Sequence, residues 1–221
     1  MPPRRGRPLF EVGRMNGNVV LNFQGRPKSE LSAYGSAFWR AANALAERLV
    51  RAGYKDTDAC PIVFLYRHSI ELYLKAIAYR GRDLLTLDRK KLHLNPKAET
   101  KHPLRPLIEA AEEVFRELDW PWDTQVEGAR TLPEVKALIG EIEAYDPESF
   151  SFRYPIDKRG NASSPKHFGF NVLRVAERLD GLLGLLDGAA DALEGEWHGR
   201  CEARAEAFGE TLDNADGEPF E

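Results

Sequence analysis

Residues 61–77 read PIVFLYRHSIELYLKAI, and this stretch decides the fold of the chain. At about 100° per residue on a helix, its apolar side chains cover more than half of the circumference. A helix that is apolar over so wide an arc packs against neighbours on several sides. The remaining arc carries Arg67, His68, Glu71 and Lys75. Because charges near a core are costly unless they are paired or used, this strip is the main functional lead in the sequence.

The composition excludes several classes of protein. Hydrophobic residues make up 43% and charged residues 30% of the 221 residues, which is typical of a globular protein. No apolar run reaches the ~18 residues that span a bilayer, and the basic N-terminus lacks the apolar stretch of a secretory signal. Cys60 and Cys201 are too few for a disulfide framework and lack metal-ligand spacing. We therefore expect a cytoplasmic protein that has free thiols, binds no metal or cofactor and does not contact a membrane.

The charges are distributed unevenly along the chain. Residues 1–40 carry seven Arg or Lys against two Glu, whereas residues 180–221 carry twelve Asp or Glu against two Arg. A basic arm can attract a phosphate backbone, although charged termini are more often simply solvated. We expect a disordered basic arm over 1–16, a single helical domain over 17–208 and a disordered acidic tail over 209–221.

Caps and breakers divide the domain into about five helices. The predicted helices run from Ser29 to Gly53, from residues 57–61 to Gly81, from Pro103 to Pro121, from the capping box at Thr131 to Asp146, and from Ser164 beyond Trp197. Residues 18–23 and 150–157 are β-prone, so they could pair with each other. The expected fold class is therefore all-α: an antiparallel helical bundle with a small extended or β element.

Three pieces of the sequence resemble the bacterial HEPN-like proteins. Residues 66–76 resemble the Arg-His-x-x-Glu-Leu-x-x-Lys helix of that group, and residues 101–104 resemble the His-x-Leu that opens its next helix. Residues 152–157, followed by Gly160, resemble its Phe-Arg-Tyr-Pro segment. The three pieces occur in the same order and together cover roughly residues 30–195.

The resemblance implies a helical bundle that forms a homodimer. It also implies an RNA- or nucleotide-directed module of a toxin or phage-defence system, with an antitoxin or other defence protein as its partner. Members that cleave RNA carry an Arg-x4–6-His motif. In this chain three residues separate Arg89 from His93, seven separate Arg159 from His167, and Arg67 directly precedes His68, so none of these pairs has the motif spacing.

Two interpretations of the strip stay open from the sequence alone. In the first, the protein is a metal-independent endoribonuclease, in which two histidines exchange protons and two arginines stabilise the phosphorane charge. The catalytic residues would be His68, His102, Arg67 and Arg153. The substrate-binding residues would be Lys75, Tyr154, Lys158 and Arg159, with Glu71 in a structural pairing role.

In the second interpretation, the protein is a non-catalytic dimerising scaffold. Arg67, Glu71 and Lys75 then form an ion-pair network that ties the central helix to its neighbours, through Arg153 or a backbone carbonyl. His68 is then a core residue and His102 a helix cap. The two interpretations differ in one geometric respect: catalysis needs the four residues in a common cleft open to solvent, whereas the scaffold needs them buried and mutually satisfied.

Overall fold

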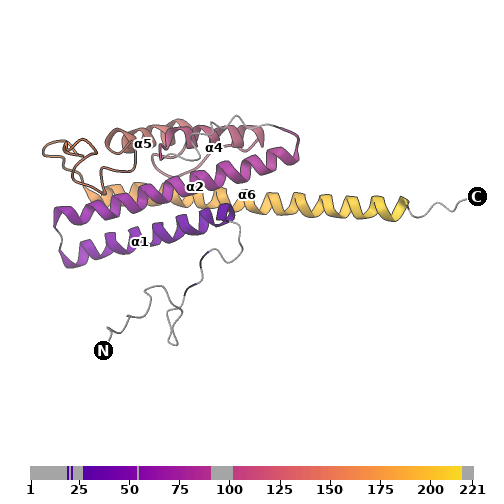
Figure 1. Cartoon of the computed structure of the whole chain (residues 1–221), viewed down its shortest axis with the longest axis horizontal. Helices are drawn as coiled ribbons and strands as arrows, with labels where there is room; N and C mark the ends of the chain where they lie inside the picture. The colour runs from indigo at the N-terminus through magenta and orange to yellow at the C-terminus, as the bar shows by residue number, and fades with distance from the viewer. Residues whose placement is uncertain (1–18, 20, 22–26, 54, 91–101, 216–221) are drawn as a thin grey trace, which may run out of the picture.

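The computed structural model describes residues 19, 21, 27–53, 55–90 and 102–215, and over these residues the chain is an all-α bundle, as predicted (Figure 1). The described α-helices are α1 (Leu31–Ala52), α2 (Ala59–Leu87), α4 (Arg105–Glu117), α5 (Leu132–Tyr145) and α6 (Val172–Ala215). Two short 3-10 helices, η1 (Pro27–Glu30) and η2 (Asp56–Asp58), precede α1 and α2. The predicted basic arm over 1–16 lies outside the described residues.

Helix α2 is the central element of the bundle, as the 61–77 stretch predicts. It packs against α1, α4 and α6, and Figure 1 shows α1 and α6 along one side of it and the α4–α5 layer on the other. Many of its apolar side chains are fully buried, among them Ile70, Tyr73, Leu74 and Ile77. The wide apolar arc of α2 therefore packs against several helices at the same time.

Helix α2 is longer than predicted, because Gly81 does not end it. The helix continues to Leu87, and Gly81 is buried at the point where α4 crosses. A Cβ atom at Gly81 would clash with both γ-methyl groups of Val114. This glycine therefore allows a close approach of two helices. Gly53, in contrast, has φ of 72° and follows the end of α1, as predicted.

The predicted start of the last helix at Ser164 is wrong. Helix α6 begins at Val172, where the side chain of Asn171 accepts hydrogen bonds from the backbone N–H groups of Leu173 (3.0 Å) and Arg174 (3.1 Å). An asparagine in this position is a strong helix start. The helix then continues to Ala215, past the predicted beginning of the tail at residue 209.

The connection from Asp146 to Asn171, which we call the 146–171 loop, contains the segment 150–157 that was predicted to be extended, but residues 151–153 form a turn instead. Within it, Ile156 and Ala162 form an isolated antiparallel bridge. Most of residues 18–23, the predicted pairing partner, lie outside the described residues. The buried carboxylate of Asp146 accepts from the N–H groups of Phe150 (2.5 Å) and Ser151 (2.8 Å), and this fixes the start of the loop. Within the described ranges, no helix combines the length and apolarity of a bilayer span.

Candidate functional site

The guanidinium group of Arg67 is sealed inside the protein. Its side chain has no exposed surface, and all three of its nitrogens have partners. Nε donates to the backbone carbonyl of Asp146 (3.2 Å), Nη1 to the Glu71 carboxylate (3.2 Å) and Nη2 to the backbone carbonyl of His102 (2.8 Å). The predicted catalytic role of Arg67 does not fit this geometry, because the buried guanidinium already has a partner at each nitrogen.

Asp146 supplies a second negative charge to this network. It is fully buried, and its Oδ2 lies 3.3 Å from Nε of Arg67. Oδ2 accepts no hydrogen bond from the described residues, so among them its charge is compensated by the ion pair alone. Since Oδ1 holds the start of the 146–171 loop, Asp146 links that loop directly to the central helix.

Glu71 joins the buried end of the strip to its exposed end. It accepts from Lys75 at 2.8 Å and lies 3.0 Å from Nδ1 of His102. Burial alone would raise the pKa of Glu71, but the hydrogen bonds and positive charges of Lys75 and His102 together lower that pKa below its ordinary value. Lys75, predicted to bind substrate, is thus the salt-bridge partner of Glu71, and the predicted pairing role of Glu71 agrees with the structure.

His68 packs against two aromatic rings. Its ring lies between Phe38 (4.5 Å, edge to face) and Phe64 (5.6 Å, stacked). Burial lowers its pKa, and the opposing effect of Glu71 is smaller. A partly buried imidazole held between two rings is a packing residue rather than an exposed proton donor.

Arg153 and Tyr154 lie on the 146–171 loop and are exposed. Nε of Arg153 donates to the carbonyl of Ser149 at 2.5 Å, and its guanidinium lies 5.3 Å from the centre of the Phe64 ring. The scaffold interpretation allowed a link through Arg153 or through a backbone carbonyl. Arg153 bonds to Ser149 and not to Glu71, whereas Arg67 is linked to its neighbours through two backbone carbonyls and Asp146.

The four residues predicted to be catalytic do not share a solvent-open cleft. Arg67 is sealed, His68 is held between rings, the half-exposed His102 contacts Glu71, and Arg153 lies on the loop. The arrangement of these residues that cleavage needs is therefore absent from the described part of the chain. The described residues also contain no group of three or more His, Cys, Asp or Glu arranged to hold a metal ion.

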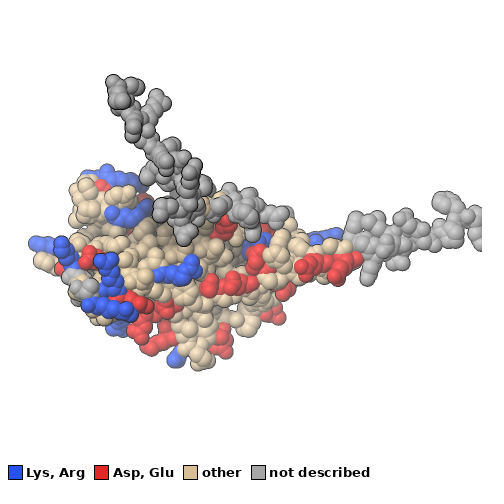
Figure 2. Space-filling view, turned by 90° about the horizontal axis from the view of Figure 1, so that it is seen from below, with Lys and Arg blue, Asp and Glu red and all other residues tan. Residues whose placement is uncertain are grey.

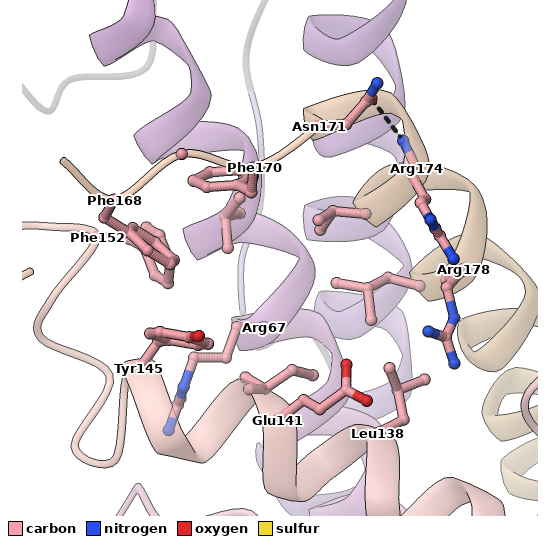
Figure 3. A pocket seen from close by; sticks show the side chains of 15 residues that line it. Arg67, Leu138, Glu141, Tyr145, Phe152, Phe168, Phe170, Asn171, Arg174 and Arg178 are labelled. Carbon is pink, nitrogen blue, oxygen red and sulfur yellow. Dashed lines mark hydrogen bonds between the residues drawn. The ribbon is translucent and has the colours of Figure 1, made fainter. Parts of the chain in front are cut away.

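A different feature has the shape of a binding site. A pocket of about 400 Å³ lies between α2, α5, the start of α6 and the 146–171 loop (Figure 3). Such a volume is typical of pockets that hold one small ligand. One wall is formed by four aromatic rings and the opposite wall by two arginines. We call it the aromatic–arginine pocket, and the residues of these walls are Tyr145, Phe152, Phe168, Phe170, Arg174 and Arg178.

The aromatic wall is a connected cluster. The centre of the Phe168 ring lies 4.5 Å from that of Tyr145 and 5.3 Å from that of Phe170. Phe152 meets Phe170 edge to face at 6.2 Å. These rings come from the end of α5 and from the 146–171 loop, so the aromatic residues of the loop pack toward the pocket while Tyr154 remains exposed.

The two arginines are the unusual feature of the pocket. Neither Arg174 nor Arg178 forms an ion pair or a side-chain hydrogen bond with any residue that the structure describes. Glu141, the carboxylate that lines the pocket, pairs with neither. Figure 3 shows both arginines on the α6 side, across the pocket from Phe152, Phe168 and Tyr145, whereas Arg67 is directed away from them. Two cations without carboxylate partners beside an apolar wall favour an anionic ligand.

The absence of a side chain at Gly128 leaves room for the guanidinium of Arg178. Gly128 has φ of 74°, and a Cβ atom there would lie 2.7 Å from Nη2 of Arg178. The guanidinium therefore occupies the space that any other residue at position 128 would fill. The segment of Gly128 rests on α6 through Val126, which faces Gly181.

Many exposed cationic side chains lie at one end of the molecule. Figure 2 shows Lys and Arg side chains gathered at one end of the molecule and Asp and Glu side chains along the other part. We call this end the basic end, and its exposed cationic residues are Arg51, Lys55, Arg153, Lys158, Arg159, Lys166 and Arg174. Lys158 pairs with Glu148 and Arg51 with Glu47, whereas the Arg159 and Lys166 side chains have no carboxylate partner among the described residues.

Comparison with known proteins gives no match to a protein-family model, a curated protein or a solved structure.

Sequence reasoning missed the arginines of the pocket. Residues 150–157 and the basic residues after them were recognised, but Arg174 and Arg178 were assigned to an ordinary helix. Their i, i+4 spacing places them on one face of α6, close to its first turn. Two like charges at this spacing are unfavourable on an isolated helix, and this was the signal available in the sequence.

Proposed function

We propose that this protein is a HEPN-like RNA-binding protein that binds single-stranded RNA at its basic end without cleaving it. The observation that carries the proposal is the pair of unpartnered arginines, Arg174 and Arg178, facing an aromatic wall. Single-stranded nucleic acid is bound in general by positive grooves that follow its backbone and by aromatic rings on which bases stack. The pocket and the surrounding basic end supply both parts.

The position of the 146–171 loop supports this assignment. Arg159 and Lys166 are exposed on it, and its ring residues Phe168 and Phe170 line the pocket. A strand whose base enters the pocket would therefore have its backbone beside unpaired cations of the same loop. Tyr154, stacked on Phe150 at 4.5 Å, offers a second exposed ring.

The proposal assigns a structural role to the charged strip of α2. Arg67 and Lys75 balance the charges of Glu71 and Asp146, and this arrangement favours the scaffold interpretation for those residues. The homodimer and the antitoxin or defence partner stay predictions of the family resemblance.

Binding is tested by fluorescence anisotropy with a labelled single-stranded RNA of about 12 nucleotides, a length within the usual range of site sizes. The Arg174→Ala, Arg178→Ala double variant is expected to bind at least about tenfold more weakly, because two charge-assisted contacts are lost. The matched control is Arg116→Ala, an exposed arginine near the C-terminal end of α4, and it is expected to bind as the unaltered protein does. Equal affinities of the double variant and the unaltered protein would contradict the proposal.

Absence of cleavage is tested separately by incubating the same RNA with the unaltered protein and with a His68→Ala, His102→Ala double variant. The RNA is expected to stay intact in both samples. Cleavage by the unaltered protein that the double variant abolishes would restore the nuclease interpretation.

A further inference from the structure

The charge of the pocket selects among RNA ligands. Arg67 borders the pocket, but it belongs to a buried network in which Arg67 and Lys75 balance the charges of Glu71 and Asp146. The charges left to a ligand are the two positive groups of Arg174 and Arg178 and the single negative group of Glu141. The positive groups lie together on α6, and Glu141 is on α5.

The phosphate groups of an RNA differ in charge. A phosphodiester within the chain carries one negative charge, whereas a phosphomonoester carries about −1.5 to −2 at pH 7 and has three acceptor oxygens. Arg174 and Arg178 are one helical turn apart, a spacing that puts their Cβ atoms about 5–6 Å from each other. Two guanidinium groups can therefore bind a single phosphate on the α6 side, away from Glu141 on α5, and a phosphomonoester offers them three acceptor oxygens and more charge than a diester does.

The size of the pocket favours the end of a chain. Its volume of about 400 Å³ suits one nucleotide-sized group rather than a run of stacked bases. A terminal nucleotide enters such a pocket with only one linkage leading out. An internal nucleotide would need to leave on both sides, past Phe152 on one wall and Arg174 on the other.

We infer that the aromatic–arginine pocket binds the terminal nucleotide of an RNA through its phosphomonoester. Arg174 and Arg178 bind the terminal phosphate, and the base lies against Phe168 and Phe170. Glu141 repels the phosphate from the α5 side and accepts hydrogen bonds from sugar hydroxyls or a base amino group, so it orients the nucleotide. The inference rests on the proposed function, because it names the part of the RNA that the same site recognises.

The chemistry fits either a 5′-phosphate or a 3′-phosphate, and three RNAs of one sequence separate these sources. Each carries an internal label; one has a 5′-phosphate, one a 3′-phosphate and one hydroxyls at both ends. With the unaltered protein, at least one phosphorylated RNA is expected to bind about tenfold or more tightly than the hydroxyl RNA, a difference typical of added charge-assisted contacts. The phosphorylated RNA that binds more tightly shows whether the pocket binds a 5′-phosphate or a 3′-phosphate. Equal increases in affinity mean that it binds the phosphate at either end.

Variants locate the effect. The Arg174→Ala, Arg178→Ala variant is expected to lose the preference for phosphorylated ends, whereas an Arg159→Ala, Lys166→Ala variant, altered outside the pocket, is expected to bind all three RNAs more weakly by a common factor. Free nucleoside monophosphate is expected to compete with the phosphorylated RNA, and the nucleoside is not.

The outcomes separate the inference from the proposed function. If the unaltered protein binds all three RNAs with affinities within about twofold, a difference well below one charge-assisted contact, the inference is overturned and the proposed function stands. If it binds none of them, the proposed function is overturned and the inference falls with it. The comparison of the three RNAs uses the unaltered protein, so it does not depend on how well any variant folds.

Discussion

Nη2 of Arg67 donates a hydrogen bond to the backbone carbonyl of His102 at 2.8 Å. The two residues are 35 positions apart, and His102 is the first described residue before α4. A side chain of the central helix thus fixes where the chain enters the α4–α5 layer, while the same guanidinium holds Asp146 at the far end of α5. The buried arginine connects both ends of this layer to α2.

Replacing Arg67 with Met is expected to destabilise the protein by about 3–5 kcal/mol, the usual cost of removing one partner from a buried ion pair. Glu71 would keep Lys75 as a partner, but Asp146 would be left buried and uncompensated. The measurement is the free energy of unfolding from urea denaturation. Arg51→Met removes an exposed arginine paired with Glu47 and is the control, with an expected change within about 0.5 kcal/mol. A loss below about 1 kcal/mol at Arg67 would show that the network does not hold the bundle together.

The stability of the protein is expected to fall as the pH drops below about 6.5 because of His68. Its pKa is lowered in the folded state by burial, so the unfolded chain binds more protons in this range and protonation favours unfolding. The pKa of Glu71 is also lowered in the folded state, so its protonation reduces the stability only at pH values below its ordinary pKa of 4.5. Urea denaturation at pH 7.5 and 5.5 therefore measures the effect of histidine protonation apart from that of Glu71.

His68→Phe is the variant that tests this assignment. It keeps an aromatic ring between Phe38 and Phe64 and removes the proton. The difference in unfolding free energy between the two pH values is expected to shrink in the variant. An undiminished difference would assign the pH dependence to another group.

Gly128→Ala is expected to weaken both folding and RNA binding. The residue has φ of 74°, a conformation that costs a residue with a Cβ atom about 1–2 kcal/mol, and the new methyl group would displace the guanidinium of Arg178. Gly53→Ala is a matched control, because Gly53 has φ of 72° and nothing within 4 Å of its Cβ position. Both variants should lose similar stability, and only Gly128→Ala should bind the phosphorylated RNA several-fold more weakly. If their RNA affinities are equal, Arg178 does not contribute to binding.

Two glycines within helices are expected to respond in opposite directions to alanine. Gly81→Ala should cost about 1–3 kcal/mol, because its methyl group would overpack the contact between α2 and Val114 of α4. Gly188→Ala should stabilise the protein by about 0.5–1 kcal/mol, since nothing lies within 4 Å of its Cβ position and alanine is the better helix former. Thermal and urea unfolding of the two variants give the sign of each change in unfolding free energy. If both variants are stabilised, α2 and α4 do not approach closely at Gly81.

The sequence predicted the helical bundle well because local rules determined its elements. The wide apolar arc of residues 61–77 identified a central helix, and Thr131 accepts from the N–H of Glu134 at 3.4 Å, as the capping-box spacing predicts. The rules failed where tertiary contacts overrode them. The sequence predicts a helix end at Gly81, but the helix continues, and a glycine is needed there because Val114 of α4 packs against it. The Ser164–Pro165 start was displaced to Asn171, because Phe168 and Phe170 pack into the pocket.

The site was harder to predict than the fold. Periodicity places Arg67, Glu71 and Lys75 on one face, but it does not tell whether that face meets solvent or a second layer. Here the α4–α5 layer covers it, so a strip that suggested a ligand site is internally paired. The pocket is assembled from α2, α5, α6 and the 146–171 loop, and no sequence pattern reports which of these segments meet.

The 146–171 loop is fastened at both ends, by the Asp146 carboxylate at its start and by the Asn171 cap of α6 at its finish. Lengthening a closed loop costs little, about 0.6 kcal/mol for each doubling. A short reporter peptide spliced in beside Gly160, where the chain turns in open solvent, should therefore leave the bundle intact while obstructing the face that meets nucleic acid. Such an insertion would therefore reduce RNA binding without reducing the stability of the bundle.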